Sequence, residues 1–140
     1  MPAIDVVDST WIAAPAPTVA AVVNEPANWR RWWPGLELQV SERRAAKGVR
    51  WTVPSVAGRA GLSGTAEVWL EPAGEGVVAH FFLRLDPAPG RTLSRRDVER
   101  VTDEYRRRTK SAFWALADRL DPARMQRHVS AAEPGAGSPP

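Results

Sequence analysis

The sequence predicts an α+β fold in which an antiparallel sheet lies against one long helix. Between Ser94 and Leu120 apolar residues recur three or four positions apart, which at about 100° per residue places them on one helical face. Over residues 65–71 and 77–86 apolar and polar residues alternate, as they do in strands that bury one face. The strands precede the long helix instead of alternating with helices, which is typical of the α+β class.

The first part of the chain is predicted to form one strand and two short helices. Residues 4–13 are rich in β-branched side chains and contain no breaker, and an Ala-Pro-Ala-Pro run at 14–17 ends that strand. A short helix is expected over 19–24, because a proline at its start removes only an N–H group that has no helical partner. A second helix is expected over 27–33, where Pro34-Gly35 ends it.

The first strand has two faces that could point to the core. Asp8 and Thr10 share their parity with the strand's isoleucines, whereas Val7 and Trp11 lie on the opposite face. If the first face is inward, Asp8 is a buried carboxylate that needs a partner. Alternation alone leaves both orientations open.

Two further strands are predicted before the hairpin. Apolar residues alternate over 36–40 and again over 49–53, with a turn at Lys47-Gly48 between them. The glycine-rich segment 58–64 is either a loop or the start of a strand. The sheet therefore has five convincing strands in the sequence.

The alternating segments 65–71 and 77–86 are expected to pair as a hairpin around a turn at 72–76. Any even-length turn there places two pairs directly across from each other. These pairs are Trp69 with His80 and Val68 with Phe81.

The long helix has recognisable ends. Ser94 is followed three residues later by Asp97, which resembles a capping box, and Asp121-Pro122 ends the helix because the residue before proline disfavours the helical region. We expect one domain over 1–121. Residues 122–140 are rich in Pro, Gly and Ala, and we expect a disordered tail there.

Composition excludes several classes of function. The 140 residues contain no cysteine, which excludes disulfides, thiol catalysis and thiolate metal sites. Neither a metal-binding constellation nor a glycine-rich phosphate motif is present, so no cofactor is expected. No apolar run approaches the ~20 residues of a membrane span, and the first residues do not resemble a signal peptide. The sequence favours a soluble cytoplasmic protein without stable membrane insertion.

Several local patterns together resemble the START-like superfamily, also called the SRPBCC or polyketide cyclase/dehydrase and lipid-transport family. They are Ile12-Ala-Ala-Pro15 leading into Thr18-Val-Ala-Ala-Val-Val23, then Asn28-Trp-Arg-Arg-Trp-Trp-Pro34, then Ala66-Glu-Val-Trp-Leu-Glu71, and finally Phe113-Trp-Ala-Leu-Ala-Asp-Arg-Leu120. The resemblance covers roughly residues 3–121. It consists of apolar residues and tryptophans and contains no catalytic signature.

This resemblance implies a helix-grip fold, in which a curved antiparallel sheet wraps the long C-terminal helix and two short helices close one end. It also implies a hydrophobic ligand between sheet and helix, such as a lipid, a sterol, a polyketide or a plant hormone. The chain departs from the family pattern because five strands replace the usual six or seven. A shorter sheet leaves less room for a cavity.

The expected ligand is a small hydrophobic or aromatic molecule held in that cavity. Tyr105 and Thr109 would supply its polar contacts, although a buried Tyr105 could equally bond a backbone carbonyl. Trp29 and Trp33 are favoured as core. The predicted ligand-binding residues are Trp32, Trp51, Val68, Phe81, Leu83, Tyr105, Thr109 and Ala112.

A catalytic function is the second hypothesis, as a polyketide cyclase or dehydratase. It needs an acid or base in the pocket, and Tyr105 is the only candidate. His80 is the one histidine before the tail, and Glu67 and Arg84 share its face, but that face points away from the predicted cavity. A structural role for His80 and a non-catalytic protein are therefore favoured.

The third hypothesis is a protein-interaction module with a filled core, which acts through Trp114 and the neighbouring arginines. Arg106-Arg107-Arg108 could suggest nucleic acid, yet consecutive helical residues point in different directions. Asp103 and Glu104 lie four residues before Arg107 and Arg108, a spacing that favours ion pairs within the helix. We therefore expect a solvated helix face and no nucleic-acid partner. Trp114 falls outside the apolar stripe and shares its side of the helix with arginines, so an exposed Trp114 could mark a partner or membrane-surface contact. It could also lie under the tail or form a cation–π pair.

Overall fold

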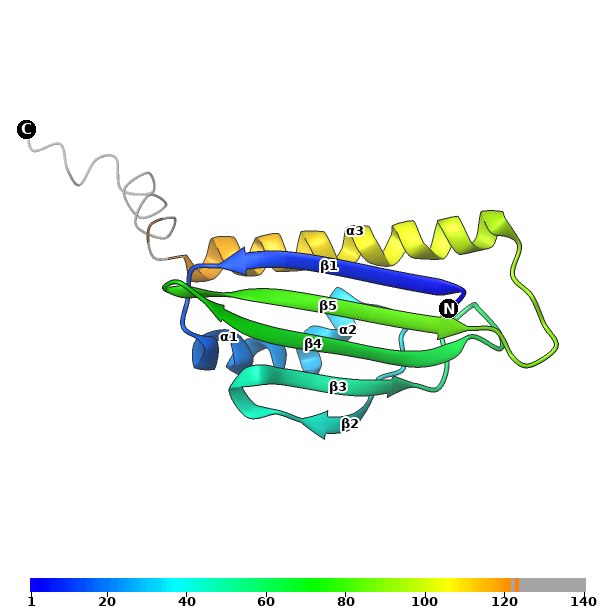
Figure 1. The fold of residues 1–140 in the computed structure, drawn as a ribbon, viewed down its shortest axis with the longest axis horizontal. Coiled ribbons are helices and arrows are strands. Elements are labelled where there is room, and N and C mark those ends of the chain that lie inside the picture. Colours follow the sequence, from blue (N-terminus) through cyan, green and yellow to red (C-terminus); the bar gives the residue numbers. More distant parts are fainter. Residues whose placement is uncertain (122, 124–140) are drawn as a thin grey trace, which may run out of the picture.

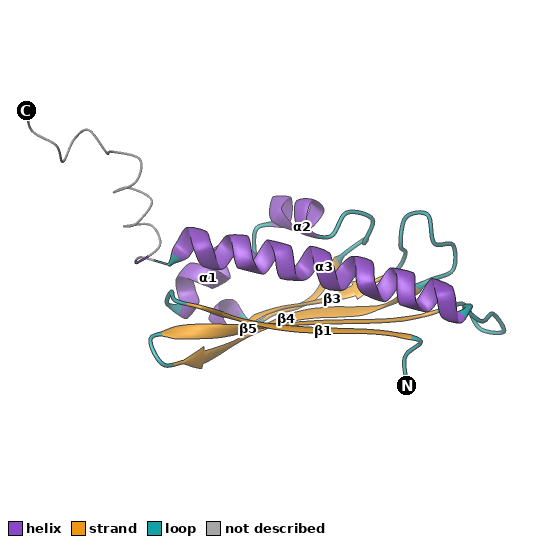
Figure 2. Ribbon diagram, turned by 90° about the horizontal axis from the view of Figure 1, so that it is seen from above, coloured by secondary structure: helices purple, strands orange, loops and turns teal. Residues whose placement is uncertain are grey.

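The computed structural model describes residues 1–121 and 123, and within them it confirms the α+β class. Five antiparallel strands form one sheet in the order β1-β5-β4-β3-β2 (Figure 1). The helix α3 runs along one side of this sheet, and α2 lies on the same side (Figure 2). The strands are β1 (Ile4–Ile12), β2 (Gln39–Arg43), β3 (Gly48–Val53), β4 (Ser63–Ala73) and β5 (Gly76–Asp86), and the helices are α1 (Ala16–Val23), α2 (Pro26–Trp32), the 3-10 turn η1 (Ala45–Lys47) and α3 (Arg95–Leu120).

The β4–β5 hairpin has the predicted register. Trp69 lies opposite His80, and Val68 lies opposite Phe81. The turn is shorter than the predicted 72–76, because the strands continue to Ala73 and Gly76 and leave only two residues between them. Gly74 begins this turn with φ 60°, a left-handed conformation that two-residue hairpin turns require.

The predicted strand at 36–40 is wrong in its position. β2 begins only at Gln39, and Leu36 forms a single isolated bridge with Val56. All five residues of β2 are exposed, so alternation in that strand does not mark a buried face. Leu36 and Leu38 instead pack from a loop against the edge of the core, which explains why apolar residues recur there. The glycine-rich segment is a loop as far as Ser63, where β4 begins.

The helices begin and end close to the predicted positions. Ser94 accepts a hydrogen bond on its side chain from the Asp97 backbone N–H at 3.1 Å, as the capping pattern indicated. No helix in the part of the chain that the structure describes is long and apolar enough to cross a membrane. Most of the predicted tail, 122 and 124–140, lies outside the described residues.

The core lies between the concave side of the sheet and the helices. β1 turns Ile4, Val6 and Ile12 inward together with Asp8 and Thr10, which settles the orientation that the sequence left open. Val7 and Trp11 lie on the outer face, each with 52% of its surface exposed. The sheet therefore has an inner face that is covered over β1, β3, β4 and β5 but not over the edge strand β2, and an outer face that keeps several apolar side chains in water.

Candidate functional site

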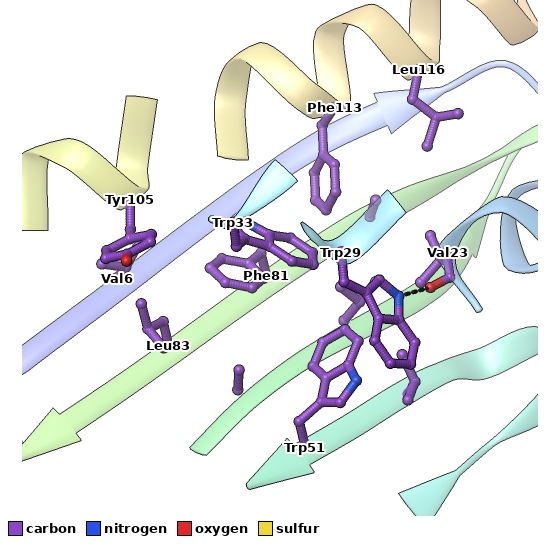
Figure 3. Packing of buried hydrophobic residues seen from close by; sticks show 14 of the residues in the cluster. Val6, Val23, Trp29, Trp33, Trp51, Phe81, Leu83, Tyr105, Phe113 and Leu116 are labelled. Atoms are coloured by element: carbon purple, nitrogen blue, oxygen red, sulfur yellow. Dashed lines mark hydrogen bonds between the residues drawn. The ribbon is translucent and has the colours of Figure 1, made fainter. Parts of the chain in front are cut away.

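Aromatic rings occupy the space between sheet and α3 where a cavity was expected. Trp33, which follows α2 directly, is fully buried and stacks on Phe81 with ring centres 4.6 Å apart (Figure 3). Three further rings pack against it in edge-on geometry: Trp32 at 5.5 Å, Trp51 at 5.7 Å and Phe113 at 6.4 Å. Such stacked and edge-on contacts fill space at the density of a protein core. Trp33 therefore connects the sheet with α3 through its ring contacts with Phe81 and Phe113.

Two hydroxyl groups on α3 hold the end of α2. Trp33 Nε1 donates a hydrogen bond to Thr109 Oγ1 at 2.9 Å, and Thr109 is fully buried. One helical turn earlier, the Tyr105 hydroxyl donates to the Pro34 carbonyl at 3.2 Å. Burial raises the pKa of Tyr105, because the charged phenolate is poorly solvated there. Of the two roles considered for Tyr105, the structure shows the bond to a backbone carbonyl.

The predicted ligand-binding residues are divided between two places. Six of them belong to the interior, where their exposed surface is at most a few per cent: Trp51, Val68, Phe81, Leu83, Tyr105 and Thr109. The other two, Trp32 and Ala112, are only partly buried and line a surface groove. One polar atom of the interior, Trp51 Nε1, has no hydrogen-bond partner among the described residues.

The surface groove lies between α2 and α3 and has a volume of about 510 Å³. It exists because α3 carries small side chains beside Trp32, namely Ser111, Ala112 and Ala115, which leave the indole partly uncovered. A smaller hollow of about 190 Å³ shares Trp32, Ala112 and Ala115 and extends towards Leu116. The remaining residues of the groove are Arg31, Glu104, Arg107 and Arg108.

Positive charge predominates around this groove, since three arginines face one carboxylate. Glu104 already pairs with Arg108 at 3.1 Å, as the sequence predicted. The predicted pair of Asp103 with Arg107 is wrong, because Asp103 lies 3.6 Å from Arg106, three residues on instead of four. Within the described residues Arg107 has no ion-pair partner. The local excess of positive charge favours an anionic group in the groove.

Trp114 extends the same surface along α3. It is 61% exposed, and Lys110 Nζ lies 5.7 Å from the centre of its ring, which is the cation–π arrangement that the sequence left open. A third, shallow hollow of about 530 Å³ is lined by Trp114, Lys110, Ser111 and Arg107. Arg107 and Ser111 also line the groove between α2 and α3, so this hollow adjoins that groove. An aromatic and cationic surface therefore runs from α2 across α3.

Comparisons with solved structures identify the fold. The Aha1 dimer from Colwellia psychrerythraea matches with a TM-score of 0.60 at 11% identity, over 85% of this chain and 97% of that one. The di-domain ARO/CYC protein StfQ of the steffimycin biosynthetic pathway matches with a TM-score of 0.60 at 14% identity, over 88% of this chain and 52% of that one. A START superfamily protein from Mycobacterium smegmatis matches with a TM-score of 0.51 at 13% identity, over 83% and 98%.

The chain has a START-like fold. The predicted helix-grip architecture is therefore confirmed, with a curved sheet and a long C-terminal helix. No protein-family model matches the sequence, and no curated protein is significantly similar to it. At these identities the likeness establishes the fold alone.

Within this START-like fold, sequence reasoning missed most of the groove. Arg31, Ser111 and Ala115 carry no pattern of their own, since small and charged residues are common on exposed helices. They form a groove only because α2 lies beside α3, and this packing cannot be predicted from the sequence of either helix alone. The Trp32-Trp33 pair could have indicated the groove. Adjacent residues of a helix point in different directions, so one of the two indoles had to lie outside the buried face.

Proposed function

We propose that the protein binds a small hydrophobic or aromatic molecule with an anionic group in the groove between α2 and α3. The groove itself supports this proposal, because it combines the partly buried indole of Trp32 with the positive charge of Arg107, which has no ion-pair partner among the described residues. The apolar part of the ligand would lie on Trp32, Ala112 and Ala115. Its anionic group would face Arg31 and Arg107. A volume of about 510 Å³ is in the range of small-molecule sites.

The indole of Trp32 is well suited to be the wall of such a site. It packs edge-on against Trp33 at 5.5 Å and against Phe113 at 6.2 Å, both of which are fully buried. A ring held by the core loses little freedom when a ligand arrives, so less affinity is lost to ordering. StfQ, one of the structural neighbours, is named as an ARO/CYC protein of a biosynthetic pathway, which motivates aromatic molecules as the first ligands to test.

A ligand inside the fold is the second candidate, and one observation favours it. Trp51 Nε1 is buried without an acceptor among the described residues, which costs free energy that an interior ligand with a carbonyl could recover. Such a ligand would have to displace Trp33 from Phe81 and Thr109. The groove needs no such displacement, and for this reason we favour it.

A catalytic role for Tyr105 has less support. Its hydroxyl is bonded to the Pro34 carbonyl, and burial raises the pKa of the phenol. A general base would need the opposite shift. We therefore propose binding without turnover at this site.

The test is a fluorescence titration with 8-anilinonaphthalene-1-sulfonate, a small aromatic anion. Ala115→Phe fills the groove, and we expect it to weaken binding at least tenfold. Arg107→Gln removes one charge contact, worth about 1 kcal/mol, and should weaken binding about fivefold. Ala21→Phe on the exposed face of α1 and Arg106→Gln on α3 are matched controls that should bind like the wild type.

Equal affinity in Ala115→Phe and the wild type would exclude the groove as the site. If the dye still binds tightly to both groove variants and Thr109→Val strengthens that binding by loosening Trp33, the interior candidate is supported. Circular dichroism of every variant checks that the fold is intact before affinities are compared.

A further inference from the structure

Three polar side chains form a connected row on the outer face of the sheet, away from the groove and the interior. Ser9 Oγ lies 2.8 Å from His80 Nδ1, and His80 Nε2 lies 3.1 Å from Glu71 Oε1. They come from β1, β5 and β4, three neighbouring strands. Ser9 lies directly opposite His80 in the β1–β5 pairing, so the contact is fixed by the register of the sheet.

The imidazole of His80 is held from both sides. Its ring stacks on Trp69 at 4.7 Å and 20°, and Phe82 follows at 6.3 Å and 19°. Only 17% of the side chain is exposed. Because β-strands carry the three side chains of the row and the two rings beside His80, the row sits on a rigid element, which is the arrangement that precise polar chemistry requires.

The hydrogen bonds assign the tautomer of the neutral ring. Glu71 is a carboxylate and can only accept, so His80 Nε2 carries the hydrogen that it donates. Nδ1 then has a free lone pair and accepts the hydrogen bond of the Ser9 hydroxyl. A serine that donates to a basic nitrogen, with a carboxylate orienting the other nitrogen, follows the logic of an activated nucleophile.

We propose that Ser9, His80 and Glu71 form an acyl-transfer site for activated esters with an apolar acyl or aryl group. Ser9 is the nucleophile, His80 the general base and Glu71 the residue that orients the base. Ser9 itself is exposed. Trp11, two residues further along β1, is 52% exposed, and Trp69, which stacks on His80, is 37% exposed, so an apolar ester has a surface to lie on. Lys110 Nζ bonds the Ser9 carbonyl at 3.1 Å and fixes the backbone under the nucleophile.

The proposed ester hydrolysis needs water as its only co-reactant. Ser9 Oγ forms a bond to the ester carbonyl carbon while its proton moves to His80 Nδ1. The bond from that carbon to the leaving oxygen breaks, and His80 gives its proton to the leaving alkoxide or phenoxide. A water molecule, deprotonated by His80 in the same way, then hydrolyses the acyl-serine and restores Ser9.

The sequence pointed to different neighbours for His80. Glu67 and Arg84 share its face, but Glu67 forms ion pairs with Arg44 at 2.9 Å and Arg50 at 3.4 Å. Arg84 lies over Phe82 at 5.5 Å. Neither bonds the imidazole, which leaves both ring nitrogens to Ser9 and Glu71.

The experiment is covalent labelling of the full chain with an alkyl fluorophosphonate, located by peptide mass spectrometry. Attack by Ser9 Oγ on phosphorus expels fluoride, and His80 takes the proton. We expect one adduct per chain, on the peptide that contains Ser9, and none in Ser9→Ala. His80→Phe keeps a ring between Trp69 and Phe82 but removes the base, and should slow labelling about 100-fold or more. Glu71→Gln should slow it about tenfold.

Ser55 provides the matched control, because its hydroxyl bonds the Glu37 carboxylate at 2.7 Å without a histidine. Ser55→Ala should label like the wild type. Release of nitrophenol from p-nitrophenyl butyrate, lost in Ser9→Ala, completes the acyl-transfer test. Labelling spread over several serines, equal rates in His80→Phe and the wild type, or labelling of Ser9 without nitrophenol release would each overturn the proposal.

Discussion

Replacing Lys110 with methionine is expected to destabilise the fold, because it leaves the Asp8 carboxylate buried without its cation. Lys110 Nζ lies 2.9 Å from Asp8 Oδ1 and also donates to Thr10 Oγ1 at 3.0 Å. Thr10 Oγ1 in turn donates to Asp8 Oδ2 at 3.1 Å. The Asp8 side chain is only 4% exposed, so water cannot replace the ammonium group effectively.

The burial of the two partners sets the size of the effect. Breaking a fully buried ion pair by removing one partner costs about 3–5 kcal/mol. Lys110 keeps 31% of its side chain in water, so part of the interaction is screened and we expect about 2–3 kcal/mol. For a domain of this size that loss lowers the melting temperature by about 10 °C. Asp8→Asn keeps a hydrogen-bonding side chain and should cost about 1–2 kcal/mol.

Urea unfolding at pH 7, followed by tryptophan fluorescence, measures these differences. The two single variants and the double variant form a cycle in which we expect a coupling of about 1–2 kcal/mol. Lys47→Met is the control, because Lys47 is exposed on η1 and its loss should cost almost nothing. A cost below about 0.5 kcal/mol for Lys110→Met, or additive single effects, would refute the view that this ion pair ties α3 to β1.

Three further predictions concern single side chains. Trp33→Ala should lower the free energy of unfolding by about 3–5 kcal/mol in chemical denaturation, since it opens a cavity and leaves Thr109 unpaired; a loss below 1 kcal/mol would contradict the packed interior. The pKa of Tyr105, the only tyrosine, is raised by burial above its ordinary value of 10.0, so the folded state holds the phenol proton more tightly and stability should fall as the pH rises above 10. Absorbance titration at alkaline pH checks this, and a phenol that ionises at the same pH in the folded protein and in urea would count against it. Gly64→Ala should strongly destabilise or prevent folding, because its Cβ would lie 1.8 Å from the Arg84 carbonyl oxygen; a melting temperature equal to that of the wild type would show the strand pair to be looser than described.

Local patterns predicted most of the fold because they follow from short-range geometry. The hairpin register follows from one turn, so pairing Val68 with Phe81 could be predicted without any knowledge of the other strands. Ser94 could be identified as a cap because capping involves only the next three residues. The prediction for the segment 36–40 was wrong because its apolar residues serve long-range packing. Leu36 and Leu38 contact the core from a loop, so their alternation does not mark a strand.

The candidate sites were harder to predict because they depend on distant segments meeting. Tyr105 and Thr109 were correctly placed on the buried stripe of α3, but their partners lie about 70 residues earlier in the chain. Ser9 and His80 are 71 residues apart, and only the pairing of β1 with β5 brings them together. Parity assigns a residue to a face, and it says nothing about which strand lies next to it.

The pairing of β1 with both β5 and α3 also governs the order in which the fold can be completed. Lys110 reaches Asp8 across a separation of about 100 residues. In the sheet, β1 is an edge strand and pairs with β5 alone. During synthesis β1 therefore has no sheet partner until β5 has been made, and Asp8 has no cation until α3 follows. The apolar residues of β1 are exposed to solvent or chaperones during that interval, and we expect slow folding that is limited by these long-range contacts.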